Sequence, residues 1–373
     1  MYGTAGDDEL RDVAVTSDGT ILIAGFEDSR GGIGSRGVVL ESRYGLRKRA
    51  TLDTLGSDAF EAIAIDPTTK HVWVAGRTNG SIPELFAHGG FDSLLGSLGP
   101  SGFEPVYRGA YSSQEFPKQL AVGSGYIALA GHEERLVADG STWIDPFLSA
   151  FRTDGAQHWH TIRQSADVER YTAVDVSGTT VIAGGQTAAG ATPGMFVAIY
   201  TEESNSATRH RISTSGSDEL AAIRVLPDGD ILWAGTTSGQ LGDVAHGGKD
   251  IVVGRLDAET GESLWIAQLG TDGDDHVDDI ALDDAGNIFV AADATTGDST
   301  DRDVVFLSLD SEGTVKSYEQ WGSTGDDVPT AIALDACGTA VLVGHTTGDL
   351  AGTSHGGRDG FVITARGFLA NPR

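Results

Sequence analysis

Short apolar runs, separated by turns rich in Gly, Asp and Asn, follow one another along the whole chain. In the clearest stretch the runs read VDDIAL, IFVAA, DVVFLSL and TVKSYEQW. Runs of this length that contain β-branched residues and end at Gly, Asp or Asn indicate strands joined by turns. The pattern therefore predicts four antiparallel strands in this stretch, at 277–282, 288–292, 303–309 and 314–321.

The same unit recurs seven times. Its second apolar run closes on a small residue, which we call the anchor, at Gly25, Gly76, Gly131, Gly184, Gly235, Ala292 and Gly344. A repeat of about 50 residues with four short strands in each copy is typical of a β-propeller. The sequence therefore predicts an all-β protein, one seven-bladed β-propeller domain over residues 1–373 with four-stranded antiparallel blades. The expected units are about 2–54, 55–110, 111–162, 163–212, 213–268, 269–320 and 321–373.

Turn chemistry and charge support this order of strands. A Gly lies between the first and second runs at Gly19, Gly125, Gly178, Gly229, Gly286 and Gly338, whereas the second unit reads DPTTKH. Glycine there permits the positive φ that tight hairpin turns require. The fourth run carries basic clusters such as RKR at 47–49 and RHR at 209–211. Charges on an outer strand oppose pairing between molecules, so we expect the fourth strand at the rim.

The chain carries 54 acidic against 25 basic residues, a net charge of −29. Such a field repels nucleic acid and anionic lipid, so neither is an expected partner. No apolar run is long enough to cross a membrane as a helix. The single cysteine, Cys337, excludes an internal disulfide.

The units resemble the bacterial seven-bladed β-propeller repeat (SBBP) family over essentially the whole chain. The resemblance rests on LGTDGDDHVDDIALDDAGNIFVAADATT, on HGGKDIVVGRLDAETGESLW, and on the seventh unit from GSTGDD to HGGRDGFV. Units three and four lack the Gly-Asp-Asp start. The resemblance implies a propeller exported by bacteria, at the cell surface or outside the cell, often within a larger surface protein; it implies no defined activity.

The alignment of the repeat units adds an expectation about the ends of the chain. Met1-Tyr2-Gly3 aligns with Trp321-Gly322, where a fourth strand ends, and the chain closes soon after the third strand of unit seven. The outer strand of the last blade is therefore expected to be short or absent. We expect the native polypeptide to extend further, and no secretory signal is present in this sequence.

The aspartates at the start of the repeat units are candidate metal ligands. Asp8, Asp275 and Asp327 each stand at the start of a first strand, and connections on that face surround the central channel. Carboxylates around a channel suit Ca²⁺ or another divalent cation, which takes six or more oxygen ligands. The alternative is that each Asp accepts hydrogen bonds from its own turn. Its recurrence in nearly every unit favours that architectural role.

Histidines are the other candidates. His88, His246 and His355 each lie in an HGGxD sequence, whose Asp is expected to cap the turn before the third strand. Their blades are too far apart for one shared site. His132 and His345 directly follow the anchor glycine, and Asp293 holds the same position in unit six. Because Asp293 and His345 lie on adjacent blades, the pair is a candidate for binding or acid–base chemistry.

Function follows less directly than fold. The leading prediction is an exported binding or scaffold module for protein or polysaccharide partners, without catalysis, because irregular loops break the symmetry of one face. An alternative is a channel-centred, metal-dependent hydrolase or lyase, which requires His345, His132 and Asp293 to converge. A further alternative is a structural spacer of a larger surface protein.

Overall fold

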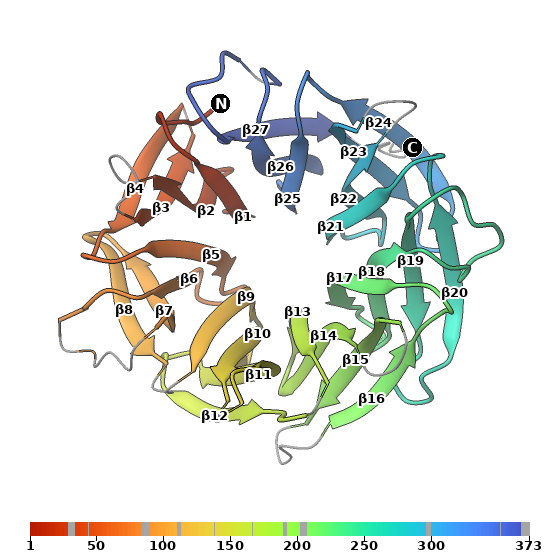
Figure 1. Cartoon of the computed structure of the whole chain (residues 1–373), viewed down its shortest axis with the longest axis horizontal. Helices are drawn as coiled ribbons and strands as arrows, with labels where there is room; N and C mark the ends of the chain where they lie inside the picture. The colour runs from red at the N-terminus through yellow and green to blue at the C-terminus, as the bar shows by residue number, and fades with distance from the viewer. Residues whose placement is uncertain are drawn as a thin grey trace.

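A computed structural model describes residues 1–28, 34–43, 45–83, 85, 90–109, 113–137, 139–165, 167–188, 192–201, 207–295, 300–350 and 352–366. These residues form seven antiparallel sheets arranged around a central channel (Figure 1). Six sheets have four strands and one has three, which confirms the predicted all-β, seven-bladed propeller. Within the described ranges no helix is long and apolar enough to cross a membrane.

Each blade is a simple meander whose first strand lies innermost (Figure 1). Blades 1 and 2 are β1 (Glu9–Val15), β2 (Ile21–Asp28), β3 (Ser35–Ser42), β4 (Leu46–Leu52), β5 (Asp58–Ile65), β6 (Val72–Thr78), β7 (Asp92–Gly99) and β8 (Gly102–Arg108). Blades 3 and 4 are β9 (Gln114–Val122), β10 (Tyr126–Leu136), β11 (Thr142–Arg152), β12 (Gln157–Ile162), β13 (Glu169–Ser177), β14 (Thr180–Thr187), β15 (Gly194–Tyr200) and β16 (Ala207–Ile212). Blades 5 and 6 are β17 (Asp218–Val225), β18 (Ile231–Thr237), β19 (Asp250–Leu256), β20 (Ser263–Leu269), β21 (Asp275–Leu282), β22 (Ile288–Thr295), β23 (Arg302–Leu309) and β24 (Val315–Trp321). Blade 7 is β25 (Asp327–Leu334), β26 (Thr339–Thr346) and β27 (Asp359–Arg366).

The hairpin between the first two strands takes the expected conformation in most blades. Positive φ values occur at Gly19, Gly178, Gly229, Gly286 and Gly338. In blade 2, where glycine is missing, Lys70 adopts a φ of 62° instead. Gly125 of blade 3 is not among the positive-φ residues, so the predicted turn type is wrong there.

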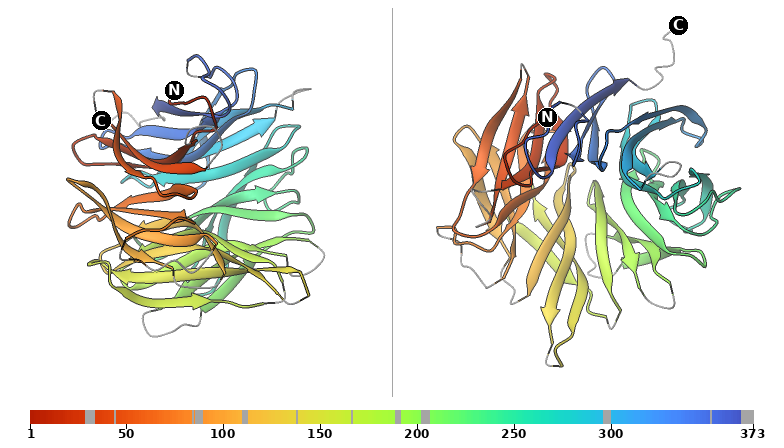
Figure 2. Two further views of the ribbon diagram at one scale, coloured as in Figure 1. Left: turned by 60° about the vertical axis from the view of Figure 1, so that its left-hand side comes forward. Right: turned by 45° about the horizontal axis from the view of Figure 1, so that its top comes forward.

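Blade 7 shows how the ring closes. Among the described residues its sheet has three strands, as the alignment of the repeat units predicted. Tyr2 forms a bridge to Gly360, with backbone N–H···O distances of 2.7 and 2.8 Å. The first residues of the chain thus lie beside β27, at the position that a fourth strand occupies in other blades (Figure 2).

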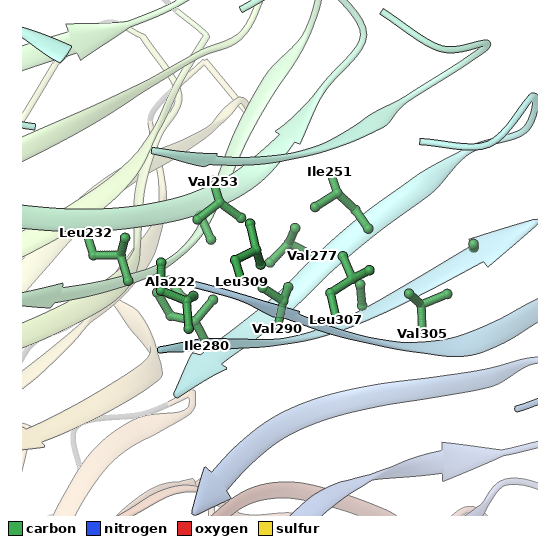
Figure 3. Packing of buried hydrophobic residues seen from close by; sticks show 14 residues of the cluster. Ala222, Leu232, Ile251, Val253, Val277, Ile280, Val290, Val305, Leu307 and Leu309 are labelled. Carbon is green, nitrogen blue, oxygen red and sulfur yellow. The ribbon is translucent and has the colours of Figure 1, made fainter. Parts of the chain in front are cut away.

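The hydrophobic core lies between blades rather than inside one of them. Between blades 5 and 6, Leu232 and Val253 pack against Val290 and Leu307 (Figure 3). A comparable cluster joins blade 7 to blade 1. Burial on both faces explains why the inner strands read as nearly continuous apolar runs.

The anchor glycines make room for a bulge. In blade 2, a Cβ added to Gly76 would lie 2.3 Å from the carbonyl oxygen of Ala59, on the neighbouring strand β5. The pairing of β5 with β6 is irregular at this point, between Phe60 and Ala62. An extra residue in one strand brings its backbone close to the partner, and a glycine there leaves the space; blade 6 has the same bulge opposite an alanine, Ala292.

The same contact corrects the repeat alignment in blade 4. A Cβ on Gly185 would lie 2.0 Å from the carbonyl oxygen of Arg170, whereas one on Gly184 would meet the side chains of Leu220 and Ile223. Gly185 is therefore the structural equivalent of the other anchors, and the predicted anchor Gly184 is wrong by one residue. The cause is the Gly-Gly pair, because both residues end the same apolar run.

Candidate functional site

Every innermost strand carries one bulge, and the bulged residue lies at the central channel. The seven bulged residues are Arg11, Glu61, Lys118, Thr172, Ala221, Asp278 and Thr330. All seven line one cavity of about 200 Å³, together with Glu9, Asp12, Gln119, Asp279, Ala331 and His345. The fold thus offers one channel position per blade, and the sequence fills these positions with basic, acidic, hydroxyl and small apolar side chains.

A network of ion pairs holds the carboxylate of Glu61 at the cavity wall. Arg11 lies 2.8 Å from Glu9 and 3.0 Å from Glu61, whereas Arg77 contacts the other oxygen of Glu61 at 3.0 Å. The Arg11 guanidinium also stacks on Phe26, with 5.1 Å to the ring centre. With two arginines on one carboxylate, the Glu61 side chain is positioned between blades 1 and 2.

Lys118 is different, because its ammonium forms no ion pair or hydrogen bond with the residues that the structure describes. It projects from the bulge of β9 into the cavity and is exposed there. A cation without a counter-ion in a chain of net charge −29 is available to a negatively charged ligand.

Asp278 lies on β21, on the opposite side of the channel from β9 (Figure 1). Its Oδ2 atom is buried and has no hydrogen-bond partner among the described groups. Burial, followed by the nearby carboxylate of Asp293, raises the pKa of Asp278 well above its usual value, although the Lys118 ammonium opposes this. A carboxyl group with a raised pKa keeps its proton to a higher pH than a free carboxyl group does, and can act as a general acid.

His345 lines the same cavity from β26. Its Nδ1 atom is buried and has no hydrogen-bond partner among the described atoms. Burial lowers the pKa of this imidazole, although the carboxylate of Glu9 opposes that effect. The ring is therefore neutral at neutral pH and can accept a proton, so the cavity holds a potential base and a potential acid.

A layer of polar residues that includes Asp12 and Asp279, which also line the cavity, bonds neighbouring blades to one another. The carboxylate of Asp12 accepts a hydrogen bond from the backbone N–H of Ile63 in the next blade, at 2.8 Å. Asp279 likewise accepts one from Ile332, at 3.1 Å. Burial raises the pKa of Asp12 to about 7. These bonds join neighbouring inner strands, which indicates a structural role for this layer.

Of the three residues expected to converge, only His345 lines the cavity. His132 on β10 stacks on Phe116, with ring centres 5.2 Å apart, and burial lowers its pKa to about 4. Asp293 on β22 lies 3.5 Å from His276 and 3.7 Å from Arg302. Among the described residues, no hydrogen bond or ion pair joins either of the predicted binding residues His132 and Asp293 to His345.

The HGGxD histidines lie apart from the cavity. The backbone N–H of His246 donates to Asp250 at 2.8 Å, and that of His355 donates to Asp359 at 2.7 Å. Each Asp thus caps the turn before a third strand, as predicted. The His355 ring is exposed and lies 3.7 Å from the same Asp359. His88, the third of these candidates, lies outside the described residues.

The carboxylate of each candidate metal ligand accepts a hydrogen bond within its own turn. Asp8, Asp275 and Asp327 accept the backbone N–H of the residue four positions earlier, at 2.5 to 2.7 Å. They lie in three different blades. Within the part of the chain that the structure describes, no three His, Cys, Asp or Glu residues form a group that could hold a metal ion. The arrangement is that of turn caps.

The first Asp of each Gly-Asp-Asp sequence ties two blades together. Asp7 accepts the backbone N–H of Arg358 at 3.0 Å, and Asp274 accepts that of Lys249 at 2.9 Å. In return, the N–H of Asp8 donates to the carbonyl oxygen of Arg358 at 2.8 Å. This motif therefore acts as an architectural clamp between blades.

Comparisons with known proteins show the fold. No family model matches this sequence, and no curated protein matches it. Among solved structures, a PL25 ulvan lyase bound to -[GlcA(1-4)Rha3S]- matches at 9% identity, over 98% of this chain and 96% of that one, with a TM-score of 0.57. Polysaccharide lyase Uly1 matches at 12% identity, over 98% and 90%, with a TM-score of 0.54. The GH93 α-L-arabinofuranosidase of Fusarium graminearum matches at 11%, over 98% and 96%, with a TM-score of 0.52.

These matches correct the leading functional prediction. A binding or scaffold module without catalysis was expected, yet the matching propellers include polysaccharide lyases and a glycoside hydrolase. The findings favour the alternative, a channel-centred hydrolase or lyase. At such low identity the likeness itself extends only to the fold, so a proposal for this chain depends on its own residues.

The bulge residues Arg11, Glu61, Lys118 and Asp278 were missed at the sequence level. They differ from blade to blade, so a search for recurring residues passes over them. Their position does recur, because each bulged residue lies 13 to 15 positions before the structural anchor of its blade. That spacing, combined with a glycine that no turn requires, is the signal that could have found them.

Proposed function

We propose that this protein cleaves a polysaccharide by β-elimination, in the cavity at the mouth of its central channel. The observation that carries the proposal is that one cavity is lined by an unpaired cation, a neutral imidazole and a carboxyl group of raised pKa: Lys118, His345 and Asp278. The likeness to polysaccharide lyases supports this choice of substrate class.

Each group has a role that its surroundings suit. Lys118 binds the carboxylate of a uronic acid unit and withdraws charge, which makes the proton at C5 more acidic. The neutral imidazole of His345 accepts that proton. As the C4–O glycosidic bond breaks, Asp278 gives its proton to the leaving oxygen. A double bond forms between C4 and C5, so the step consumes no water.

The setting of the reaction is also a proposal. The resemblance to the SBBP repeat family supports an exported bacterial protein, and the large negative charge keeps such a chain soluble outside the cell. A polysaccharide substrate is compatible with that location. Glycan is accordingly the partner class that we favour.

The test is incubation of the purified protein with a panel of uronate-containing and neutral polysaccharides. β-Elimination gives an unsaturated sugar that absorbs in the ultraviolet, whereas hydrolysis gives new reducing ends without that absorbance. We expect ultraviolet-absorbing product, and a loss of about 10²-fold or more in His345→Gln and in Asp278→Asn.

The control is Arg47→Gln, which changes an exposed residue on the outer strand β4 and should retain full activity. New reducing ends without ultraviolet absorbance would show hydrolysis and contradict the elimination step. Absence of any cleavage, with folding verified by circular dichroism, would contradict the proposed function.

A further inference from the structure

The channel mouth is basic over blades 2 to 4, although the chain as a whole is strongly acidic. Arg77, Lys118 and Arg170 lie on β6, β9 and β13, around the stacked rings of Phe116 and His132. We propose that these five residues, called here the basic arc, form a subsite that holds an anionic sugar unit of the chain being cleaved. The inference rests on the proposed function, because it specifies the substrate of the same cavity.

Within the basic arc, aromatic rings and a guanidinium group stack on one another. The Arg77 guanidinium lies 5.0 Å from the ring centre of Phe91 and 5.2 Å from that of Phe116. On strand β10 the His132 ring stacks on Phe116, with an angle of 19° between the planes. All of these rings are partly exposed. Flat, partly exposed rings at the edge of a cavity provide a platform on which a sugar ring can stack.

Two cations of the arc lack a counter-ion. Neither Lys118 nor Arg170 has an ion pair or side-chain hydrogen bond with any residue that the structure describes. Both lie on innermost strands, with Arg170 two residues before the bulge of β13 and Lys118 at the bulge of β9. By contrast, Arg11 and Arg77 both form ion pairs with Glu61, and Arg11 forms a second one with Glu9. The unpaired positive charge is thus concentrated on blades 3 and 4.

The proximity of these cations affects the imidazole between them. Burial is the main reason that the pKa of His132 falls to about 4, and the charges of Arg170, Arg77 and Lys118 lower it further. His132 is therefore neutral and adds a hydrogen-bonding ring rather than a fourth charge. The arrangement repels cations and favours an anion that accepts hydrogen bonds from Lys and Arg.

The opposite side of the mouth carries the reverse charge. Asp278 and Asp293 lie on blade 6, across the channel from strand β9 of the arc (Figure 1). The Asp293 carboxylate on that side repels an anionic group, so a bound chain is oriented with its acidic substituent toward blades 3 and 4. That orientation places the neighbouring glycosidic bond over the cavity that holds Asp278.

The chemistry of the arc fits a carboxylate or a sulfate ester, since both are anions that accept several hydrogen bonds. The experiment therefore uses matched oligosaccharide pairs: an oligouronide with its carboxyl-reduced form, and a sulfated oligosaccharide with its desulfated form. Binding is measured by calorimetry on the whole protein carrying His345→Gln, which prevents turnover. We expect the anionic member of at least one pair to bind about tenfold or more tightly, which is the effect of losing one charge-assisted hydrogen bond.

Two further variants locate the site. Lys118→Gln and Arg170→Gln should each reduce binding of the anionic oligosaccharide about tenfold and leave the neutral form unchanged. Arg47→Gln, which removes an exposed charge from the outer strand, should change neither. Equal binding of both members of each pair, or full binding by the two variants with their folding verified, would overturn the inference.

These results are separate from the outcome for the proposed function. Ultraviolet-absorbing product formed from an oligouronide by Arg170→Gln with the kcat and KM of the wild-type protein would support the proposed elimination and remove the basic arc as a subsite. Selective binding of anionic oligosaccharides without cleavage by the wild-type protein would support the arc and contradict the catalytic proposal.

Discussion

The guanidinium of Arg224 donates a hydrogen bond to the carboxylate of Asp279 at 2.9 Å and another to the carbonyl oxygen of Ile280 at 2.6 Å. Arg224 belongs to blade 5 and its two acceptors belong to blade 6. Asp279 in turn accepts the backbone N–H of Ile332 in blade 7. One side-chain pair within the channel thus joins three consecutive blades.

Removal of this arginine should weaken the ring. We expect Arg224→Met to lower the free energy of unfolding by about 2 to 3 kcal/mol, because Asp279 is left without its cation in a site that excludes most water. Urea denaturation is the measurement. Arg255→Met is the control, since Arg255 pairs with Asp228 and Asp230 near the hairpin turns of blade 5, and an exposed pair contributes less than about 1 kcal/mol. Equal effects of the two variants would contradict the role of Arg224.

Glu115 gives the protein a pH-dependent stability. Burial, followed by the charges of Asp92 and Glu133, raises its pKa to about 7, although hydrogen bonds from Ser93 oppose the shift. The folded state therefore binds this proton more tightly than the unfolded state does, and stability falls as pH rises from the unfolded value toward 7. We expect Glu115→Gln to stabilise the protein by about 2 kcal/mol at pH 8 and to have little effect at pH 5.

Denaturation curves across that pH interval check this expectation. Glu312→Gln is the matched control, because Glu312 is exposed in a hairpin turn. An unchanged pH dependence in Glu115→Gln would show that the carboxylate is already charged in the folded protein at low pH.

The anchor glycine can be tested at blade 2. A methyl group at Gly76 would lie 2.3 Å from the carbonyl oxygen of Ala59, which cannot move without shifting the bulge. We expect Gly76→Ala to cost about 2 kcal/mol of stability or more, as an overpacked interior does. Gly99→Ala is the control, because its nearest neighbour is the flexible carboxylate of Glu104. Thermal unfolding that shifts equally in both variants would contradict the explanation from the bulge.

The activity should show a broad pH optimum. The lowered pKa of His345 keeps the base neutral below the usual range of imidazole, and the raised pKa of Asp278 keeps the acid protonated above the usual range of a carboxyl group. We therefore expect a bell-shaped profile of kcat/KM whose acidic limb disappears in His345→Gln and whose basic limb disappears in Asp278→Asn. A profile that keeps both limbs in the variants would assign the two roles elsewhere.

Divalent cations offer a further test. The carboxylates of Asp8, Asp275 and Asp327 already accept hydrogen bonds within their own turns. We expect the melting temperature of chelator-treated protein to show no saturable rise with Ca²⁺, Zn²⁺ or Mn²⁺. A saturable rise of several degrees with one ion would restore the metal site that the acidic turns suggested.

The fold was predictable because it depends on features that recur. The strands expected at 277–282 and 303–309 are β21 and β23, with ends that differ by two residues or fewer. Repetition also revealed the anchor glycines. Repetition did not reveal the residues that line the cavity, since Lys118 and Asp278 have no counterparts of the same type in other blades. His345 was identified because it directly follows an anchor, whereas the contacts of Asp293 with His276 and Arg302 depend on side-chain directions that no spacing reports.

The bulge in each inner strand has a consequence for how this propeller can change over time. Because a bulged residue is an extra residue in the ladder, its side chain contributes little to the apolar layers between blades. Seven such positions, one on each blade, can be exchanged singly while the frame around them persists. A lineage with this architecture can therefore acquire or lose a reaction through a few substitutions around one opening, without rebuilding the walls that surround it.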